Sequence, residues 1–272
     1  MTKTRKTTTP APPASTRRSG RAALVLPARL ASTRLPRKLL LAETGRPLLA
    51  HTVECALEAA RRSKGAIARV LVAADCEELA AVARSAGAEA VLTDPNHKSG
   101  TDRIAEAAAG IGEDVIVNLQ ADEPEMPAEA VLGLARLLLD SADEVMATLA
   151  APIGAPEDLA NPNVVKVVVD STGHALYFSR APIPWARDAW TDGRDPVKHA
   201  LRHFGIYAYR RDFLLGYSRL PASRLEELEK LEQLRALEAG RRIACAVVET
   251  VPEGIDTPES YAAFVGRWKA RG

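Results

Sequence analysis

Apolar runs alternate with helical patterns over the first part of this chain. Five apolar residues between 46 and 63 recur at the spacing of one helix face, which predicts a helix there: Leu49, Val53, Ala56, Leu57 and Ala60. The same reasoning predicts helices over 76–86, 100–109 and 128–139, and buried strands over 22–26, 67–74, 88–92 and 115–119. Asp75 and Glu78 have the spacing of a capping box at the start of the second helix, and Gly87 suits its end. This alternation predicts a parallel sheet with helices on both faces.

After residue 144 the pattern changes to strands with few helices between them. Strands are expected over 145–153, 163–170, 174–179, 201–210 and 243–248, with a hairpin turn over 170–173. Helices are expected over 224–239 and 257–269. Leucines recur every third residue in the first of these helices, which favours a core face over a zipper, because a heptad seam alternates spacings of three and four. We therefore expect a smaller mixed β subdomain to follow the parallel sheet.

Composition narrows the class of protein. The chain has 272 residues, of which 47% are hydrophobic and 26% charged, as in an ordinary soluble globular domain. No run of eighteen apolar residues is present, so no membrane span is predicted. Cys55, Cys76 and Cys245 are odd in number and form no C-x-x-C, which argues against a disulfide framework or a zinc site. The cysteines therefore favour a reducing, cytoplasmic compartment.

Positive charge is concentrated at the amino terminus. Residues 1–20 hold five basic side chains and no acid, so they account for more than the whole net charge of +1 and leave the rest of the chain at −4. A mildly acidic body argues against non-specific nucleic-acid binding. The first twenty residues are rich in Thr, Pro and Arg and have no apolar periodicity, so we expect a disordered basic tail rather than an amphipathic transit peptide.

A second basic segment follows the first predicted strand. It runs from Pro27 to Lys38, contains Arg29, Arg34 and Arg37, and has no acidic residue. A loop at the carboxyl end of a first strand is where open α/β sheets bind ligands, and Arg and Lys suit an anionic group. On composition alone, a solvated basic loop explains this segment equally well.

Several nucleotide and hydrolase motifs are absent, including G-x-G-x-x-G, the P-loop, G-x-S-x-G and H-E-x-x-H. The segments that are present closely resemble the sugar-acid cytidylyltransferases, and among them the CMP-Kdo synthetase family, where Kdo is 3-deoxy-manno-octulosonate. The resemblance runs in order over about 240 residues and includes L-P-A-R-L-A-S-T-R-L-P-R-K-L (26–39), S-G-T-D-R (99–103), V-N-L-Q-A-D-E-P (117–124), A-L-Y-F-S-R-A-P-I-P (175–184), H-F-G-I-Y-A-Y (203–209), L-E-Q-L-R-A-L (231–237) and I-D-T-P-E (255–259).

This resemblance implies a fold and an activity. The fold is a Rossmann-like α/β nucleotidyltransferase, with a nucleotide-binding part over about 21–150, a sugar-binding and dimerisation part over about 151–240, and a closing strand and helix over 241–272. The implied enzyme is a cytosolic, Mg²⁺-dependent homodimer that transfers CMP from CTP to Kdo for lipopolysaccharide assembly. The 2-hydroxyl of Kdo attacks the α-phosphorus in line and pyrophosphate leaves, without a covalent enzyme intermediate. Catalysis then rests on positioning and charge neutralisation.

The resemblance also assigns site residues. The nucleotide-binding set is Pro27, Ala28, Arg29, Lys38, Ser99, Gly100, Arg103 and Gln120, and the catalytic set is Arg29, Lys38 and Asp122. The sugar-binding set is Gln120, Arg180, His203, Tyr207, Glu232 and Gln233. Asp122 and Asp256 are implied to hold Mg²⁺, which prefers one or two carboxylates. Asp256 has a competing local role, since Asp-Thr-Pro-Glu before a helix is also a good helix cap.

Three residues depart from the family pattern. Arg37 and Ala121 stand where the family usually has glycine, and Arg224 stands where proline is common. If the glycine replaced by Arg37 has a positive φ, Arg37 is strained; if not, it adds a phosphate contact. Two alternatives stay open. One is a cytidylyltransferase for a related acidic sugar such as 8-amino-Kdo, and the other is a non-catalytic nucleotide-binding module.

Overall fold

The computed structural model describes residues 20–188, 196–221 and 223–271. These residues contain one nine-stranded sheet in the order β3-β2-β1-β4-β8-β5-β9, with β6 paired to β7 and β8. The strands are β1 (Ala22–Ala28), β2 (Ile67–Ala74), β3 (Glu89–Leu92), β4 (Val115–Asn118), β5 (Met146–Pro152), β6 (Lys166–Val169), β7 (Ala175–Ser179), β8 (Leu201–Arg210) and β9 (Ala244–Val247). The predicted tail, apart from its last residue, lies outside the described residues.

Helices cover this sheet and connect its strands. They are α1 (Leu48–Arg62), α2 (Glu77–Ser85), α3 (Gly100–Ala109), α4 (Ala128–Leu139), α5 (Pro156–Ala160), α7 (Arg211–Tyr217), α8 (Arg224–Glu229), α9 (Gln233–Glu238) and α10 (Pro258–Lys269), with 3₁₀ turns η1 (Lys38–Leu40) and η2 (Pro196–His199). The predicted helices over 100–109 and 128–139 are confirmed as α3 and α4. The sequence pattern did not predict α5, α7 or the two 3₁₀ turns. Within the described residues, no helix is long and apolar enough to cross a membrane.

The parallel sheet predicted for the first part of the chain is confirmed. β1 pairs in parallel with β2 and β4, and β2 pairs in parallel with β3. β8 then lies antiparallel between β4 and β5, and β9 is parallel to β5. The later strand β8 therefore joins the two earlier strands β4 and β5 into one sheet. The division of the body into three functional parts stays a prediction.

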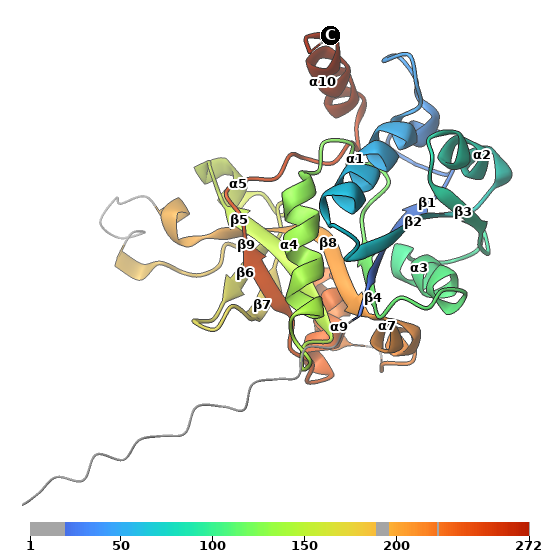
Figure 1. Cartoon of the computed structure of the whole chain (residues 1–272). Coiled ribbons are helices and arrows are strands. Elements are labelled where there is room, and N and C mark those ends of the chain that lie inside the picture. The colour runs from blue at the N-terminus through green and yellow to red at the C-terminus, as the bar shows by residue number, and fades with distance from the viewer. Residues whose placement is uncertain (1–19, 189–195, 222, 272) are drawn as a thin grey trace, which may run out of the picture.

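Both faces of the sheet are buried. Leu24 and Leu26 of β1 pack into a core with α1, α2 and α4, whereas Ala23 and Val25 pack into a second core with α3 and α7. Figure 1 shows α1 and α4 next to each other across one face of the sheet. A strand buried on both faces reads as a continuous apolar run, which is why β1 shows no alternation in the sequence.

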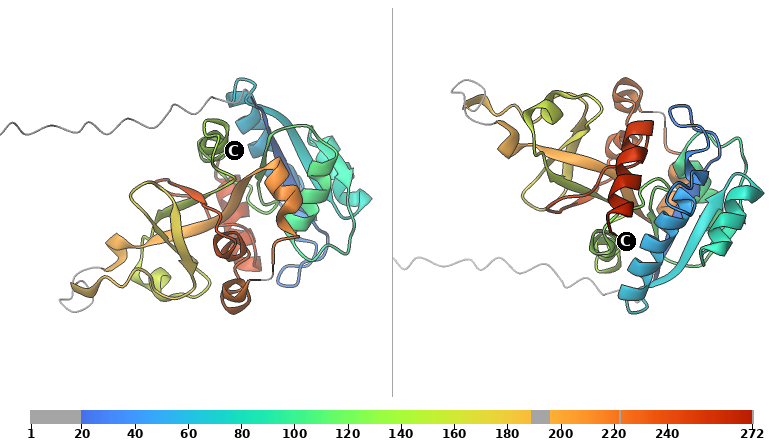
Figure 2. Two further views of the ribbon diagram at one scale, coloured as in Figure 1. Left: turned by 90° about the horizontal axis from the view of Figure 1, so that it is seen from below. Right: turned by 90° about the horizontal axis from the view of Figure 1, so that it is seen from above.

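A smaller part of the chain extends to one side of this layered body. In both views of Figure 2, the yellow-to-orange segments, which include β6 and β7, project away from the blue and green segments. β6 and β7 form an antiparallel pair, and β6 also pairs with β8. The predicted hairpin turn at 170–173 is confirmed, because the Gly173 amide donates to the Asp170 carbonyl at 3.1 Å. The expected mixed β subdomain is therefore present.

The single helix predicted over 224–239 is wrong. The chain forms two short helices, α8 and α9, because Lys230 ends α8 in the left-handed conformation at φ 55°. Leu231 and Leu234 are buried, but Leu228 is 66% exposed. A leucine at every third residue therefore does not lie on one core face, because the helix axis changes direction at Lys230.

The capping box predicted at Asp75 and Glu78 is also wrong. The residue that caps α2 is Cys76, and it makes no side-chain capping bond. The Asp75 carboxylate instead accepts the Leu30 amide, at 2.9 and 3.1 Å to its two oxygens. Asp75 therefore fixes the loop that leaves β1, which a local spacing rule could not show.

Candidate functional site

The carboxyl ends of three parallel strands meet at one edge of the sheet. Arg29 follows β1, Asp75 follows β2, and Gln120 lies two residues after β4. Helix α3 begins at the same edge with Ser99 as its cap. Loops at this edge of an open α/β sheet form its usual ligand site, and Arg29, Ser99 and Gln120, all predicted to bind the nucleotide, are gathered there.

The first cavity at this edge, here called the basic cavity, has a volume of about 250 Å³. Gln120, Arg29 and Arg103 are brought together there although they come from three different elements. The complete lining is Pro27, Arg29, His97, Lys98, Ser99, Gly100, Arg103, Gln120 and Glu232. Six of the eight predicted nucleotide-binding residues are among them. The other two are Ala28, whose side chain is buried in the core, and Lys38.

Helix α3 directs its amino terminus toward the basic cavity. The Ser99 hydroxyl accepts the Asp102 amide at 3.1 Å and so caps the helix, while Gly100 lines the cavity. Unpaired amides and the helix dipole favour an anion at such an end. Arg103 adds a guanidinium one turn later; it is only 3% exposed and donates to the Thr93 hydroxyl. The basic cavity is therefore suited to phosphate oxygens.

A second and larger cavity of about 610 Å³, here called the carboxylate cavity, adjoins the first through Gln120. It brings the two predicted metal-binding aspartates together with four of the six predicted sugar-binding side chains. Its polar lining includes Gln120, Asp122, Glu123, Asn161, Asn163, Arg202, His203, Tyr207, Gln233, Glu253, Asp256, Thr257 and Ser260.

Lys38 connects the two predicted metal-binding residues. Its ammonium donates to the carboxylates of Asp122 and Asp256, to the latter at 2.7 Å, and to the Ile255 carbonyl at 3.1 Å. Burial by itself would lower the pKa of Lys38, but the two carboxylates outweigh it and raise that pKa. Arg34 holds the other oxygen of Asp256 at 2.9 Å. Burial would raise the pKa of Asp256, but Lys38 and Arg34 lower it, so the carboxylate stays ionised.

Asp256 is not the cap of α10. Thr257 takes that position: its hydroxyl accepts the Ser260 amide at 3.2 Å, and the Ser260 hydroxyl accepts the Thr257 amide at 3.0 Å. This is a reciprocal capping box, with Pro258 in the first turn as expected. The local competing role for Asp256 is therefore wrong, and its carboxylate pairs with Lys38 and Arg34 in the wall of the carboxylate cavity.

The donor set fits a divalent cation. Mg²⁺ needs one or two carboxylates, with water and substrate oxygens completing its octahedron. Asp122 and Asp256 already share one cationic group, so this position attracts positive charge. Beside them, one carboxylate oxygen of Glu123 is buried and has no hydrogen-bond partner within the described part of the chain. Burial and the charges of Asp122 and Asp256 raise the pKa of Glu123 to about 8.

Besides Gln120, three predicted sugar-binding side chains lie on the wall of the carboxylate cavity. His203 and Tyr207 share one side of β8, with ring centroids 5.5 Å apart. Burial lowers the pKa of His203 to about 3 and raises the pKa of Tyr207 well above its usual value, so both rings are neutral near pH 7. The Gln233 side-chain nitrogen is buried and has no partner among the described residues. This part of the wall therefore offers neutral hydrogen-bonding groups, as a polyol requires.

Two other predicted sugar-binding residues are placed differently. The Arg180 guanidinium does not line the carboxylate cavity and donates to the carbonyls of Glu229 at 2.7 Å and Pro162 at 2.9 Å. Glu232 lines the basic cavity and accepts the Thr101 hydroxyl at 2.9 Å. Burial raises the pKa of Glu232. The sugar-binding roles of Arg180 and Glu232 stay predictions.

Residues that the sequence did not single out complete the carboxylate cavity. Asn161 and Asn163 come from the loop before β6, and Arg202 precedes His203 in β8. Arg202 forms an ion pair with Glu253 at 2.8 Å. Side chains alternate along a strand, so pattern alone gives no reason to expect Arg202 and His203 in one cavity. The nearest sequence signal was the polar N-P-N segment at 161–163.

The departures from the family pattern now have local explanations. Arg37 is left-handed, at φ 52°, so the strained alternative holds, and its guanidinium pairs with Glu78 at 2.5 Å. Ala121 is buried but is not among the described residues with positive φ, so a side chain is tolerated there. Arg224 is the first residue of α8 and lines neither cavity. None of the three alters the lining of the basic cavity.

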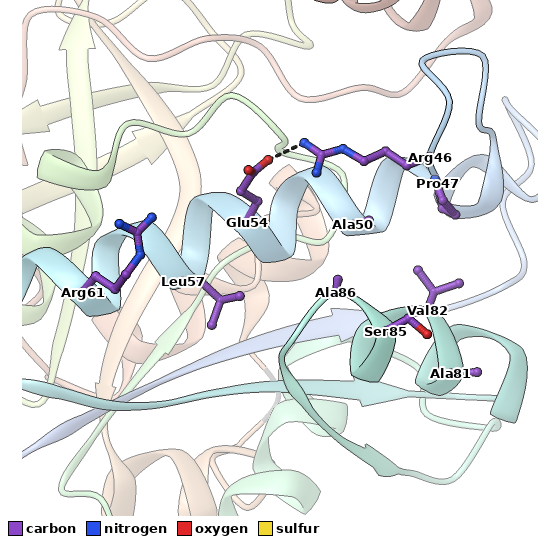
Figure 3. A pocket seen from close by; sticks show the side chains of 10 residues that line it. All are labelled: Arg46, Pro47, Ala50, Glu54, Leu57, Arg61, Ala81, Val82, Ser85 and Ala86. Carbon is purple, nitrogen blue, oxygen red and sulfur yellow. Dashed lines mark hydrogen bonds and ion pairs between the residues drawn. The ribbon is translucent and has the colours of Figure 1, made fainter.

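Another hollow lies away from the predicted site. It is a groove of about 670 Å³ between α1 and α2, lined by Arg46, Pro47, Ala50, Glu54, Leu57, Arg61, Ala81, Val82, Ser85 and Ala86. Figure 3 shows Leu57 and Val82 directed into it, with Arg46 paired to Glu54 above. Its lining is mostly apolar and contains no predicted site residue, so we assign no part of the predicted chemistry to it.

The fold and the two cavities define a nucleotidyltransferase, and the chain belongs to the cytidylyltransferase family, whose profile matches residues 23–243. A 3-deoxy-manno-octulosonate cytidylyltransferase of Xanthomonas campestris pv. campestris (strain 8004) is 50% identical over 244 residues, covering 87% of this chain and 95% of that protein. A protein of the same name from Pectobacterium carotovorum subsp. carotovorum (strain PC1) is 45% identical, covering 88% of this chain and 95% of its own length.

Solved structures agree with this assignment. A CMP:2-keto-3-deoxy-manno-octonic acid synthetase complexed with CTP superposes with a TM-score of 0.85 at 39% identity, covering 93% of this chain and all of that one. The 4-diphosphocytidyl-2C-methyl-D-erythritol synthase of Anaerococcus prevotii matches with a TM-score of 0.60 at 11% identity, covering 92% of this chain and 99% of its own. The second likeness shows the fold alone.

Proposed function

We propose that this chain transfers CMP from CTP to Kdo, giving CMP-Kdo and pyrophosphate. The observation that carries the proposal is the pair of cavities that meet at Gln120, one basic and one holding two carboxylates bridged by Lys38. A nucleoside triphosphate and a sugar acid are both anionic, so cations are needed between them. The names of the relatives supply the identities of the two substrates.

The basic cavity is assigned to CTP. Arg29 and Arg103 offer forked guanidinium groups, and the start of α3 offers backbone amides. Lys38 lines neither cavity and is 14% exposed, but it binds Asp122 and Asp256 in the wall of the carboxylate cavity. Its ammonium can therefore neutralise charge on a triphosphate while remaining near Asp122.

The carboxylate cavity is assigned to the acceptor sugar. His203, Tyr207 and Gln233 supply hydrogen bonds to hydroxyl groups, and Arg202 supplies positive charge for a carboxylate. The 2-hydroxyl of Kdo attacks the α-phosphorus in line, pyrophosphate departs, and the hydroxyl proton is released to solvent or to a nearby base. These residues act by orienting the two substrates, because positioning contributes most of the rate in such transfers.

A magnesium ion is proposed as the cofactor. Asp122 and Asp256 would hold it, in competition with the Lys38 ammonium that both carboxylates now bind. When bound, the ion neutralises charge on the phosphate oxygens. In the part of the chain that the structure describes, no three His, Cys, Asp or Glu side chains form a metal-ligand cluster, and Mg²⁺ does not require one.

Two alternatives compete with this proposal. A sister enzyme for a related acidic sugar such as 8-amino-Kdo would use the same carboxylates and differ only in the carboxylate cavity. A non-catalytic nucleotide-binding module would have no need to bring Lys38, Asp122 and Asp256 together from three distant segments. The structure-based support therefore favours an enzyme.

The proposal also covers the oligomeric state of the enzyme and its cellular compartment. We place the reaction in the cytoplasm, because the three cysteines are free thiols, and assign it to lipopolysaccharide biosynthesis. We expect a homodimer, and exposed apolar side chains such as Leu176, Leu228 and Val247 are available for a protein interface. Light scattering of the purified chain tests the dimer by giving twice the mass of one chain.

The central experiment measures pyrophosphate release across a panel of nucleoside triphosphates and sugar acids. CTP with Kdo is expected to turn over, with little release from ATP or GTP. Lys38→Gln should lose most of this turnover, whereas the exposed Lys269→Gln on α10 serves as the matched control and should retain it. Equal turnover with a purine triphosphate would contradict the proposal. Turnover of sialic acid without turnover of Kdo would also contradict it.

A further inference from the structure

Strand β8 is irregular where it passes β5. Thr148 of β5 pairs with Tyr207, but the next residue of β5, Leu149, pairs with Phe204, which leaves Gly205 and Ile206 without partners in β5. A bulge of this kind interrupts the ladder and turns backbone groups away from it. The Thr148 hydroxyl occupies the interruption, with its oxygen 2.9 Å from the Ile206 carbonyl and 3.2 Å from the Phe204 carbonyl.

The same hydroxyl lies 2.9 Å from Nε2 of His203. A hydroxyl has one hydrogen to donate, and backbone carbonyls can only accept. Two carbonyl oxygens lie this close to the hydroxyl oxygen of Thr148, so its hydrogen must point to one of them. If the hydrogen pointed to His203 instead, the lone pairs of the hydroxyl oxygen would face the lone pairs of both carbonyl oxygens. The oxygen of Thr148 is therefore an acceptor toward His203, so Nε2 must carry a hydrogen.

We propose that Thr148 is a positioning residue that holds His203 as the neutral tautomer protonated on Nε2, and so leaves Nδ1 as an acceptor for a hydroxyl group of the sugar acid. The part of this inference that concerns the sugar rests on the proposed function, whereas the tautomer itself does not. Thr148 is fully buried and lines neither cavity, so it acts on a ligand only through His203.

The surroundings of His203 agree with a neutral ring. Its neighbours are the rings of Phe178 at 4.8 Å and Tyr207 at 5.5 Å between centroids, and no described carboxylate forms an ion pair with it. Nδ1 has no hydrogen-bond partner among the residues that the structure describes, and His203 lines the carboxylate cavity. The remaining polar atom of the ring is therefore the one available to a ligand.

The bulge orients a second side chain of the site. The Gly205 carbonyl accepts a hydrogen bond from Nε2 of Gln120 at 3.2 Å. A carbonyl can only accept, so this contact fixes which end of the Gln120 amide is the nitrogen and leaves its oxygen as an acceptor. His203 and Gln120 are thus both set to accept hydrogen bonds, which matches a ligand whose hydroxyls donate them.

The tautomer can be measured directly in the full-length protein. Long-range ¹H–¹⁵N spectra separate a protonated ring nitrogen from a bare one, and His203→Gln identifies the His203 signals among those of the five histidines. We expect Nε2 of the wild-type protein to be protonated and Nδ1 bare at pH 7. A signal with Nδ1 protonated, or a charged ring, overturns the proposal without use of any variant at Thr148.

Two variants at Thr148 test the consequence for binding. Thr148→Val keeps the shape and removes the hydroxyl, so the fixed tautomer should be lost and KM for Kdo should rise about five- to tenfold, the effect of one aligned hydrogen bond, with KM for CTP unchanged. Thr148→Ser keeps the hydroxyl and should restore both readouts. An unchanged tautomer and KM in Thr148→Val would overturn the positioning role. If the spectra show the expected tautomer but the enzyme does not turn over Kdo, the proposed function is refuted. The contact between Thr148 and His203 is then still established.

Discussion

The ammonium of Lys38 lies 2.7 Å from the carboxylate of Asp256, although 218 residues separate them in the sequence. The same ammonium also binds Asp122. Three segments therefore converge on one cation: the turn after the β1 loop, the end of β4 and the connection into α10. Because both carboxylates bind the same ammonium, they lie close enough together to act as a pair of metal ligands.

The first prediction concerns the metal role of the two aspartates. Asp122→Asn and Asp256→Asn should fold normally but lose most of their turnover and require more Mg²⁺, because each removes one anionic ligand. Turnover measured against Mg²⁺ concentration tests this. Wild-type magnesium dependence in either variant would remove that residue from the site.

A matched control distinguishes metal binding by Asp256 from an effect of this residue on the start of α10. Thr257→Ala removes the capping hydroxyl of α10 next to Asp256 and should lower the free energy of unfolding by about 1 kcal/mol. Its magnesium requirement should stay that of the wild type. If Thr257→Ala raised the magnesium requirement as much as Asp256→Asn, the aspartate would act by placing α10 rather than by binding metal.

The second prediction concerns the strained backbone at Arg37. Arg37→Gly relieves a left-handed conformation that costs a residue with a side chain roughly 1 kcal/mol, and it loses an exposed ion pair with Glu78 worth about 0–1 kcal/mol. The free energy of unfolding should therefore stay the same or rise by up to about 1 kcal/mol. Glu78→Gln, which removes the ion pair alone, should not raise it. KM for CTP should not change in Arg37→Gly; an increase would mean that the guanidinium binds phosphate.

The third prediction concerns Lys166, whose side chain is fully buried. Its ammonium donates to the carbonyls of Asn161, Val164 and Arg180 at 2.6–2.9 Å. Lys166→Met keeps the volume but leaves these carbonyls without a donor, so the free energy of unfolding should fall by about 3 kcal/mol. Lys269→Met, on the exposed side of α10, is the control and should change it by less than about 0.5 kcal/mol. Chemical denaturation compares the two, and equal effects would show that the buried contacts do not stabilise the fold.

The fourth prediction concerns acid stability. Burial lowers the pKa of His203 to about 3, below its unfolded value near 6.5, so the unfolded chain binds the extra proton first as pH falls. His203 therefore has no effect on stability above about pH 6.5 and destabilises the folded state progressively below it. Between pH 7 and 5.5 the free energy of unfolding should fall by about 1 kcal/mol more in the wild type than in His203→Gln. Parallel pH profiles for the two proteins would show that His203 is charged in the folded state.

Local sequence was sufficient for much of the fold and for the location of the site. The helices α3 and α4 were predicted to the residue, because their apolar residues follow the 3.6-residue period. The basic segment after β1 was expected near a ligand because it leaves the carboxyl end of the first strand, whereas the start of α3 was expected there because S-G-T-D-R resembles a family motif. These inferences need only neighbours along the chain.

The tertiary structure decided which side chains meet. Periodicity did not show that Lys38 bridges Asp122 and Asp256, that Asp75 clamps the β1 loop instead of capping α2, or that Lys230 divides a predicted helix in two. It could not show the contact between Thr148 and His203 either, because a bulge between two strands sets it. Hydrogen bonds act over about 3 Å. Which partner lies within that range depends on how segments distant in the sequence pack, and no local pattern contains that information.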